Sequence, residues 1–341
     1  MSRPPIDGIG FDSERLDGFL RERLGAAGRM HLERIAGGQS NPTFFVEYDN
    51  RRLVLRKKPA GDTLPSAHAV DREYRVLAAL AETGVPVPAV LLFHADPEVI
   101  GTPFYVMERV EGRVFHTASM EGARPAERGP MYFAAAETLA RLHDVDWQAV
   151  GLEGFGRPGN YFARQIARWT RQWEAARFRD IPDLARLADW LPQHVPPDDE
   201  TTIVHGDYRI GNLMFHPTEP RVVAVLDWEL STLGHPLADL AFSALAWRST
   251  PEEYGGIAGL DRQALGIPDE ADYLAQYHRH RRTGSGRPVD VFHMVFAMFR
   301  FAVIFEGIAA RARAGTAAGR DAADVGELSL AFARHGAALI G

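Results

Sequence analysis

Two carboxylates and an amide stand at the ends of short apolar segments in the middle of the sequence. Residues 203 to 215 read IVHGDYRIGNLMF, so Asn212 follows Asp207 by five positions, and Asp227 ends the later apolar run VVAVL. A phosphoryl-transfer site needs one carboxylate that accepts a hydroxyl proton and oxygen ligands that hold a metal ion. Asp207 suits the first task. Asn212 and Asp227 suit the second, because Mg²⁺ prefers a few protein oxygens together with waters and phosphates.

Two further features of the sequence are given ordinary structural roles. His205 precedes Asp207 by two positions, and we expect its ring nitrogens to tie the loop to the core rather than to take part in catalysis. The segment from Gly154 to Gly159 spells GxGxxG, but no strand is predicted before it and Pro158 interrupts the helix start. A dinucleotide site requires both elements, so we do not expect one here.

The elements that would position these residues fall into two regions. Up to about residue 110 the sequence predicts strands and a single helix. Runs at 43–49 and 51–57 flank Asn50 and predict a hairpin, because both are rich in β-branched and aromatic residues. Apolar residues at helical spacing predict a helix from Pro65 through about Glu82. Two further strands are predicted at 88–93 and 103–107.

Beyond residue 110 the pattern is mainly helical. Helices are predicted at 131–142 and 291–310, and short strands at 203–205, 213–215 and 222–226. We therefore predict two domains, residues 1–110 and 111–341, and an α+β fold with a small sheet-rich lobe and a larger helical lobe.

Composition excludes several classes of protein. Of the 341 residues 46% are hydrophobic and 24% charged, as in globular proteins, and the net charge of -7 argues against a nucleic-acid binder. The sequence has no cysteine, which excludes disulfides, thiolate metal sites and a cysteine nucleophile. No signal peptide is recognised, and we expect no segment that spans a membrane. We expect a cytoplasmic protein.

The order of these motifs resembles the aminoglycoside phosphotransferase family, whose members are related to protein kinases. His205-Gly206-Asp207 with Asn212 resembles the family's catalytic loop, and Leu226-Asp227-Trp228 its metal-binding segment. STLGHPLADLA at 231–241 resembles the segment that supports the catalytic loop, with Asp239 as a buried brace. The resemblance extends over about residues 30 to 310 and implies a protein-kinase-like fold of two lobes.

The same resemblance implies ATP and Mg²⁺ as cofactors, with ATP bound between the lobes. Its metal ligands would be Asn212 and Asp227, and Asp207 would be the catalytic base. GGQSN at 37–41 resembles the nucleotide loop, and residues 107–110 the hinge that binds adenine. The nucleotide-binding residues implied are Gly38, Gln39, Ser40, Asn41, Arg56 or Lys58, Glu73, Glu108 and Val110.

The cation that binds phosphate is left as a choice between two residues. Strand alternation places Arg56 and Lys58 on one face and Lys57 on the other. One of the first two should reach the phosphates and pair with Glu73. The position in the motif favours Arg56, although Lys57 and Lys58 are the only lysines of the sequence.

The acceptor is implied by a closer resemblance, to the kinase-like domains associated with acyl-CoA dehydrogenases. The stretch VLRKKPAGDTLPSAHAVDREYRVL at 54–77 carries it, together with GHPLADLA at 234–241. It implies a small hydroxylated acceptor such as a 4-hydroxyacyl-CoA or a related hydroxy acid, and a functional link to an acyl-CoA dehydrogenase. An aminoglycoside acceptor and a silent nucleotide- or metabolite-binding module stay as alternatives.

Two regions are candidates for acceptor contacts. The basic run HRHRR at 278–282 could meet an anionic acceptor, although such a run is more often a solvated face. Polar residues of 157–165 could line the acceptor site, although a helix start at the surface explains them equally well. Oligomeric state and the preference for ATP over GTP are left open.

Overall fold

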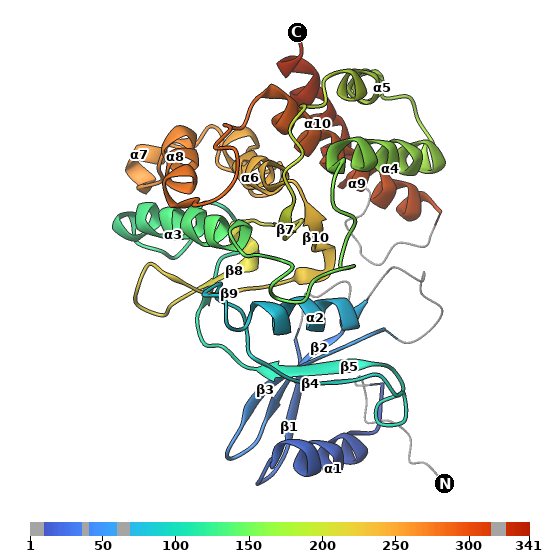
Figure 1. Cartoon of the computed structure of the whole chain (residues 1–341), viewed down its shortest axis with the longest axis vertical. Helices are drawn as coiled ribbons and strands as arrows, with labels where there is room; N and C mark the ends of the chain where they lie inside the picture. The colour runs from blue at the N-terminus through green and yellow to red at the C-terminus, as the bar shows by residue number, and fades with distance from the viewer. Residues whose placement is uncertain (1–9, 36–40, 60–68, 315–324) are drawn as a thin grey trace. The chain divides into compact units, whose positions relative to one another are not determined.

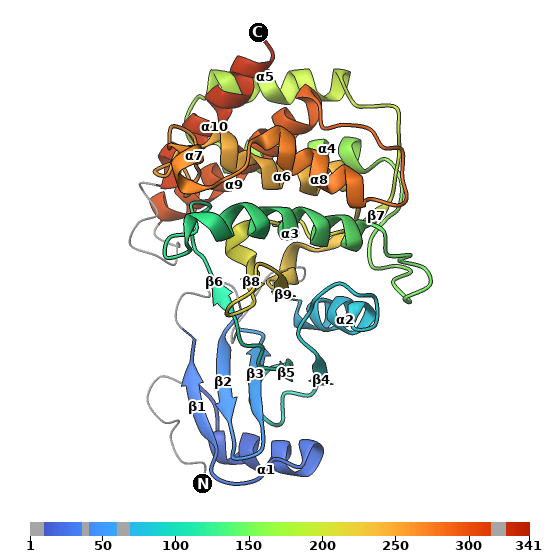
Figure 2. The same ribbon diagram turned by 90° about the vertical axis from the view of Figure 1, so that its left-hand side faces the viewer.

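The computed structural model describes residues 10–35, 41–59, 69–314 and 325–341, and it divides into two compact units. Unit 1 comprises residues 1–111 and unit 2 residues 112–341. Figures 1 and 2 show the elements of each unit from two directions. The predicted class is confirmed: the chain has a protein-kinase-like α+β fold.

Unit 1 is built on a five-stranded sheet with the order β1-β2-β3-β5-β4, in which each neighbouring pair is antiparallel. Its elements are α1 (Ser13–Leu24), β1 (His31–Arg34), β2 (Thr43–Glu47), β3 (Arg52–Lys57), α2 (Val70–Leu80), β4 (Val90–His94) and β5 (Phe104–Glu108). The predicted hairpin around Asn50 is β2–β3, with Phe44 opposite Leu55. The predicted start of α2 at Pro65 lies outside the described residues.

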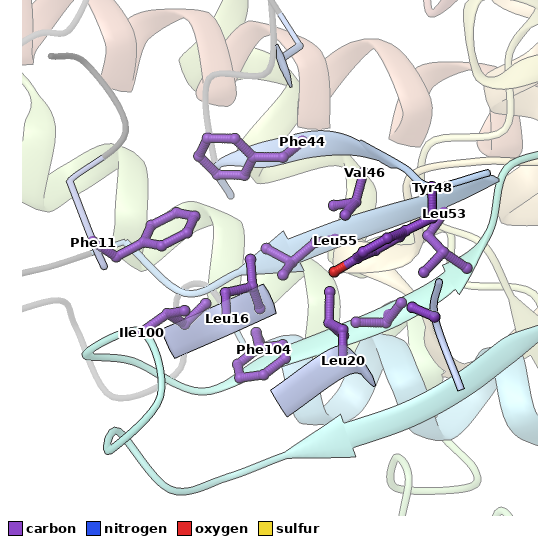
Figure 3. Close-up of a cluster of buried hydrophobic side chains, with 12 residues drawn as sticks. Phe11, Leu16, Leu20, Phe44, Val46, Tyr48, Leu53, Leu55, Ile100 and Phe104 are labelled. Atoms are coloured by element: carbon purple, nitrogen blue, oxygen red, sulfur yellow. The ribbon is translucent and has the colours of Figure 1, made fainter. Parts of the chain in front are cut away.

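The two faces of this sheet have different partners. On one face, Leu16 and Leu20 of α1 pack with apolar strand residues such as Leu55 and Phe104, as Figure 3 shows. On the other face, Arg56 and Tyr105 contact Glu73 of α2. Strand alternation produces this division, because successive side chains point to opposite faces. This alternation along β3 was predicted from the sequence, whereas α1 and β1 were not.

Unit 2 contains helices and two small sheets, with the orders β6-β8-β9 and β10-β7. Its strands are β6 (Arg113–Val114), β7 (Thr202–Val204), β8 (Leu213–Phe215), β9 (Val222–Val225) and β10 (Thr232–Gly234). Its α-helices are α3 (Pro125–His143), α4 (Tyr161–Ala176), α5 (Pro182–Trp190), α6 (Pro236–Ala244), α7 (Arg262–Leu265), α8 (Glu270–His280), α9 (Val291–Arg313) and α10 (Val325–Leu339). The predicted strands correspond to β7, β8 and β9, whereas β6 and β10 were not predicted.

The helix α9 corrects one expectation from the sequence. By length and composition it could cross a membrane, contrary to the expectation that no segment could. In the structure 83% of its most apolar window is buried within the protein. Helices α4, α6 and α10 pack against it.

Candidate active site

The predicted catalytic loop begins where β7 ends. β7 is fully buried and pairs with β10, with Val204 opposite Thr232. After it the chain turns through Gly206, whose φ is +84° and where a Cβ atom would lie 2.6 Å from the carbonyl oxygen of Leu230. A side chain would not fit there, so glycine allows the turn that presents Asp207.

Asp207 and Asn212 contact each other directly. The amide Nδ2 of Asn212 donates hydrogen bonds to Oδ2 of Asp207 (2.7 Å) and to its backbone carbonyl (2.8 Å). A short 3₁₀ helix, Ile210–Asn212, closes the loop. Because the amide nitrogen faces Asp207, its Oδ1 is the atom left to serve as a metal ligand.

The hairpin β8–β9 brings Asp227 to the same end of the sheet as Asn212. Leu213 pairs with Val225, and the N–H of Leu226 donates to the carbonyl of Asn212 (2.9 Å). The two predicted metal ligands therefore flank one antiparallel pair, although Asp227 lies fifteen positions further along the chain. Their convergence is set by strand register and could not be obtained from spacing alone.

Asp227 has an unusual backbone conformation. Its φ of 64° and ψ of 64° are left-handed, and a 3₁₀ helix, Trp228–Leu230, starts directly after it. Among residues other than glycine, this conformation is adopted most readily by Asn and Asp and is concentrated at functional sites. The conformation agrees with the predicted role as a ligand, which stays a prediction.

His205 has the structural role expected of it. Its ring is fully buried; Nδ1 accepts from the N–H of Asp207 (3.2 Å) and Nε2 contacts the carbonyl of Leu226 (2.8 Å). Nδ1 is therefore the acceptor and Nε2 the donor. The ring fixes the catalytic loop to the residue that precedes Asp227.

Asp239 of α6 is the brace that the sequence predicted. Its carboxylate accepts from the backbone N–H groups of His205 (2.5 Å) and Gly206 (2.8 Å), and lies 3.5 Å from Nε2 of the buried His143. Burial acts to raise the pKa of Asp239, but the His143 contact and the backbone donors outweigh it and lower that pKa. Asp239 thus carries charge in the core and orders the loop.

A second brace, Arg300, was not predicted from the sequence. This nearly buried guanidinium donates to the carbonyl of Gly206 and lies between the rings of Trp169 (5.6 Å) and Phe242 (5.3 Å). Its signal was present in the sequence, because it is a charged residue within the apolar run VFAMFRFAVIF of α9. Such a residue inside a buried helix needs a partner.

The surroundings of Asp207 alter its acidity. Burial raises the pKa of Asp207 above its ordinary value, although Arg209, His205 and the Asn212 amide act in the opposite direction. The Nε of Arg209 lies 3.6 Å from Oδ2 of Asp207. A raised carboxyl pKa favours proton acceptance, because a general base works best when its pKa approaches the working pH.

In unit 1, the predicted ion pair between β3 and α2 is present and involves Arg56. Its Nε lies 2.9 Å from Oε2 of Glu73, which also accepts from the hydroxyl of Tyr105 (3.0 Å). The amide of Asn41 donates to Oε1 of Glu73 (2.6 Å), so the last residue of the predicted nucleotide loop is tied to α2. The structure therefore orients Arg56 through Glu73, while its role toward phosphate stays a prediction.

The two lysines beside Arg56 differ in their surroundings. Lys57 is nearly buried, burial lowers its pKa, and its Nζ lies 5.5 Å from the ring centre of Phe11. Lys58 follows the end of β3 and donates its backbone N–H to Pro103 (2.9 Å). Lys57 thus lies on the α1 side of the sheet, as strand alternation predicted.

The other predicted nucleotide contacts are only partly described. The amides of Glu108 and Arg109 donate to the carbonyls of Ala89 (2.8 Å) and Arg52 (2.9 Å). Within the described part of unit 1, the amide of Val110 has no such backbone bond, and its contact with adenine stays a prediction. Gly38, Gln39 and Ser40 lie outside the described residues.

In both regions suggested for acceptor contacts, some side chains are engaged in contacts within unit 2, and the acceptor role stays a prediction. Arg281 of the basic run is nearly buried and forms ion pairs with Asp144 and Glu200. In the second region Tyr161 is buried, and Arg164 donates to the carbonyl of Arg157. These contacts hold together the segments around α3, α4 and α8.

The donor set suits Mg²⁺ bound to nucleotide. Asn212 and Asp227 offer hard oxygen atoms, and a Mg²⁺ ion in such sites completes its octahedron with waters and phosphate oxygens. Among the residues that the structure describes, no three His, Asp or Glu side chains gather into a metal cluster.

Solved structures share this arrangement of elements. A protein from Ralstonia eutropha provisionally described as an aminoglycoside phosphotransferase is 46% identical, with a TM-score of 0.87 over 96% of this chain and 98% of that one. The aminoglycoside phosphotransferase APH(4)-Ia, at 19% identity and a TM-score of 0.61, covers 94% of this chain and 98% of its own and has the same fold. The fold and the site define a kinase-like phosphotransferase.

Sequence relatives define the family. The model of the phosphotransferase enzyme family matches residues 31–283, and the chain belongs to that family. Acyl-CoA dehydrogenase family member 10 of Mus musculus is 42% identical over 97% of this chain, and family member 11 of Homo sapiens is 41% identical over 91%. The chain spans 31% and 41% of the length of these two relatives.

Proposed function

We propose that this protein transfers a phosphoryl group from ATP, with Mg²⁺, to the hydroxyl of a small molecule. The observation that carries the proposal is the constellation in unit 2. Asp207 contacts Asn212 at 2.7 Å, and the β8–β9 register brings Asp227 beside Asn212 through the Leu226 backbone bond. Phosphoryl transfer depends mainly on positioning and charge stabilisation, for which these groups are suited.

Each residue of the constellation has a defined task in this proposal. Asp207 would orient the acceptor hydroxyl and accept its proton, which its raised pKa favours. Asn212 and Asp227 would hold the metal, and Arg56, oriented by Glu73, would bind phosphate oxygens. Bound Mg·ATP supplies the transferable phosphoryl group and neutralises part of its charge.

A hydroxyacyl compound is the acceptor that we propose, with 4-hydroxyacyl-CoA as the first candidate. The support is the similarity to relatives that are named acyl-CoA dehydrogenase family members and that contain this chain's counterpart as one part of a longer protein. A functional link to an acyl-CoA dehydrogenase belongs to the same proposal. An aminoglycoside is the competing acceptor, because the relative from Ralstonia eutropha is described in those terms.

The test is Mg²⁺-dependent release of ADP in the presence of a panel of acceptors. The panel contains 3- and 4-hydroxyacyl-CoAs, the corresponding free hydroxy acids and kanamycin. We expect turnover with a hydroxyacyl compound and a loss of about 10² to 10⁴ in rate for Asp207→Asn. Asp272→Asn, at an exposed aspartate of α8, is the matched control and should keep the wild-type rate.

Three outcomes would change the proposal. Turnover with kanamycin alone would replace the hydroxyacyl acceptor by an aminoglycoside. Equal activity in Asp207→Asn and Asp272→Asn would remove Asp207 from catalysis. Binding of ATP without turnover of any acceptor would favour a silent binding module.

A further inference from the structure

Arg209 occupies a position beside Asp207 that its hydrogen bonds do not explain. It lies two residues further along the same loop, and its Nε is 3.6 Å from Oδ2 of Asp207, beyond hydrogen-bond distance. Among the described residues this buried Nε has no hydrogen-bond partner. A guanidinium whose donors are incompletely used is suited to bind an external anion.

The ring of Tyr254 also contacts this guanidinium. The centre of the Arg209 guanidinium lies 5.1 Å from the ring centre of Tyr254, a distance typical of a cation–π contact. Tyr254 has a φ of 70°, which is strained for an aromatic residue, and 39% of it is exposed. Strain of this kind is concentrated at ligand-binding positions, so both features mark Tyr254 as part of a site.

Tyr254 interacts electrostatically with the carboxylates of Asp207 and Asp227. Burial is the main reason that the pKa of its hydroxyl is raised, and the negative charges of Asp207 and Asp227 add to it. The ring also packs on Phe301 at 4.8 Å. Tyr254 therefore connects the surroundings of Asp207 with the apolar interior of unit 2.

A narrow pocket opens at this pair. Its wall includes Arg209, Tyr254, Phe242, Ala246, Phe301 and Phe332. Among the described residues that line the pocket there is no carboxylate, and the guanidinium is the one permanent charge. The cavity measures about 50 Å³ as space open to the centres of water-sized spheres. One water needs roughly 10 to 15 Å³ by that measure, so a slender chain of a few atoms fits.

We propose that this pocket receives an aliphatic segment of the acceptor and that Arg209 binds an anionic group attached to it. The inference rests on the proposed function, because it assigns the substrate class of the same site. Aromatic and aliphatic walls favour an apolar chain. Asp207 lies 3.6 Å from the Nε of Arg209, but this Nε has no hydrogen-bond partner among the described residues, and a guanidinium with an unused donor at the wall favours an acid over an amine. A polycationic aminoglycoside would meet a charge of the same sign at Arg209.

The test is a binding titration by ligand-observed NMR that requires no phosphoryl transfer. The probes are hexanoate, hexanamide and hexylammonium, which share one chain and differ in charge. Hexanoate should bind the wild type about fivefold more tightly than hexanamide, as expected for charges about 4 Å apart near water. Hexylammonium should bind most weakly of the three.

Two variants examine the two halves of the pocket. Arg209→Met should abolish the preference for hexanoate over hexanamide. Ala246→Leu, at a half-buried position of the wall, should lower the affinity for both hexanoate and hexanamide about tenfold, because the larger side chain fills the space. Ala275→Leu, at an exposed position of α8, is the matched control and should change neither affinity.

The result separates this inference from the proposed function. Equal binding of hexanoate and hexylammonium, or equal effects of Ala246→Leu and Ala275→Leu, would overturn the pocket assignment even if an acceptor is phosphorylated. The predicted pattern of binding without phosphorylation of any acceptor would uphold the pocket and overturn the kinase proposal. Asp207→Asn should bind hexanoate at least as tightly as the wild type, because it removes a nearby negative charge.

Discussion

The two units hold their charged functional side chains by different means. In unit 1, Arg56 lies on a strand and Glu73 on a helix, so regular backbone structure sets their distance. In unit 2, Asp207 lies on a loop whose backbone is held by the buried side chains of Asp239 and Arg300. A loop has no repeating hydrogen bonds of its own, so its geometry depends on such braces.

This difference accounts for the buried polar network around the loop of unit 2. Buried polar groups are costly unless they are paired, and each brace here is paired with loop backbone. The His143–Asp239 contact extends the network to α3, and the ring of His143 contacts the hydroxyl of Tyr277 on α8 (2.8 Å). The catalytic loop is therefore fixed to several helices at once.

The largest expected effect is a loss of phosphoryl-transfer rate in a variant of unit 2. Asp227→Asn keeps a residue that adopts the left-handed conformation but removes one charge from the proposed metal site. Metal stabilisation of charge contributes several kcal/mol, so we expect phosphoryl transfer to fall by about 10³-fold. The measurement is the rate of ADP release against Mg²⁺ concentration, with nucleotide binding followed separately.

A thermal unfolding scan of Asp227→Asn controls for damage to the fold. An unchanged rate at every Mg²⁺ concentration would remove Asp227 from the metal site.

An intermediate effect, on the free energy of unfolding, is expected for the ion pair between β3 and α2 in unit 1. Glu73→Gln removes the carboxylate from its nearly buried pair with Arg56, which should cost about 3 kcal/mol in the free energy of unfolding. Glu111→Gln in the same unit, at an exposed pair with Arg52, is the matched control and should cost less than about 1 kcal/mol.

The choice of probe matters in this experiment. All six tryptophans lie in unit 2, at positions 147, 169, 173, 190, 228 and 247, so their fluorescence does not report on unit 1. Hydrogen exchange of the amides in 43–57, measured by mass spectrometry across a urea series, reports on unit 1 directly. Equal destabilisation by Glu73→Gln and Glu111→Gln would show that burial of the pair is unimportant.

The smallest expected effect concerns pH. Activity should fall as the pH drops through the raised pKa of Asp207, because a protonated carboxyl group accepts no proton. Arg209 acts to lower that pKa, so Arg209→Met should move the acidic limb of the profile to higher pH. The measurement is kcat/KM against pH with an uncharged acceptor, and Arg209→Lys should restore most of the wild-type position.

Much of the fold was predictable because it is periodic. The β2–β3 hairpin, α2 and α9 were predicted from alternation or helical spacing, which reflect one buried face or a buried helix. The strands β6 and β10 were not predicted. Each has only two or three residues and forms through pairing with a distant partner, which leaves little trace in local sequence.

The contacts of the candidate site were also predicted only in part. Glu73 was expected to pair with Arg56 or Lys58, Asp239 to brace the catalytic loop and His205 to tie that loop to the core, and such contacts are present. Arg209 and Tyr254 were not recognised as a pair, because forty-five positions separate them and no period connects them.

By itself, the sequence determined the reaction class and the identity of the candidate groups, because residue types and short spacings decide which chemistry a loop can support. Only the tertiary structure decided which groups meet. It paired Arg56 with Glu73, brought Asn212 and Asp227 to one end of a hairpin, and placed Arg209 over Tyr254 beside a narrow apolar pocket. Such meetings depend on strand register and on packing between distant segments, which act through space and not along the chain.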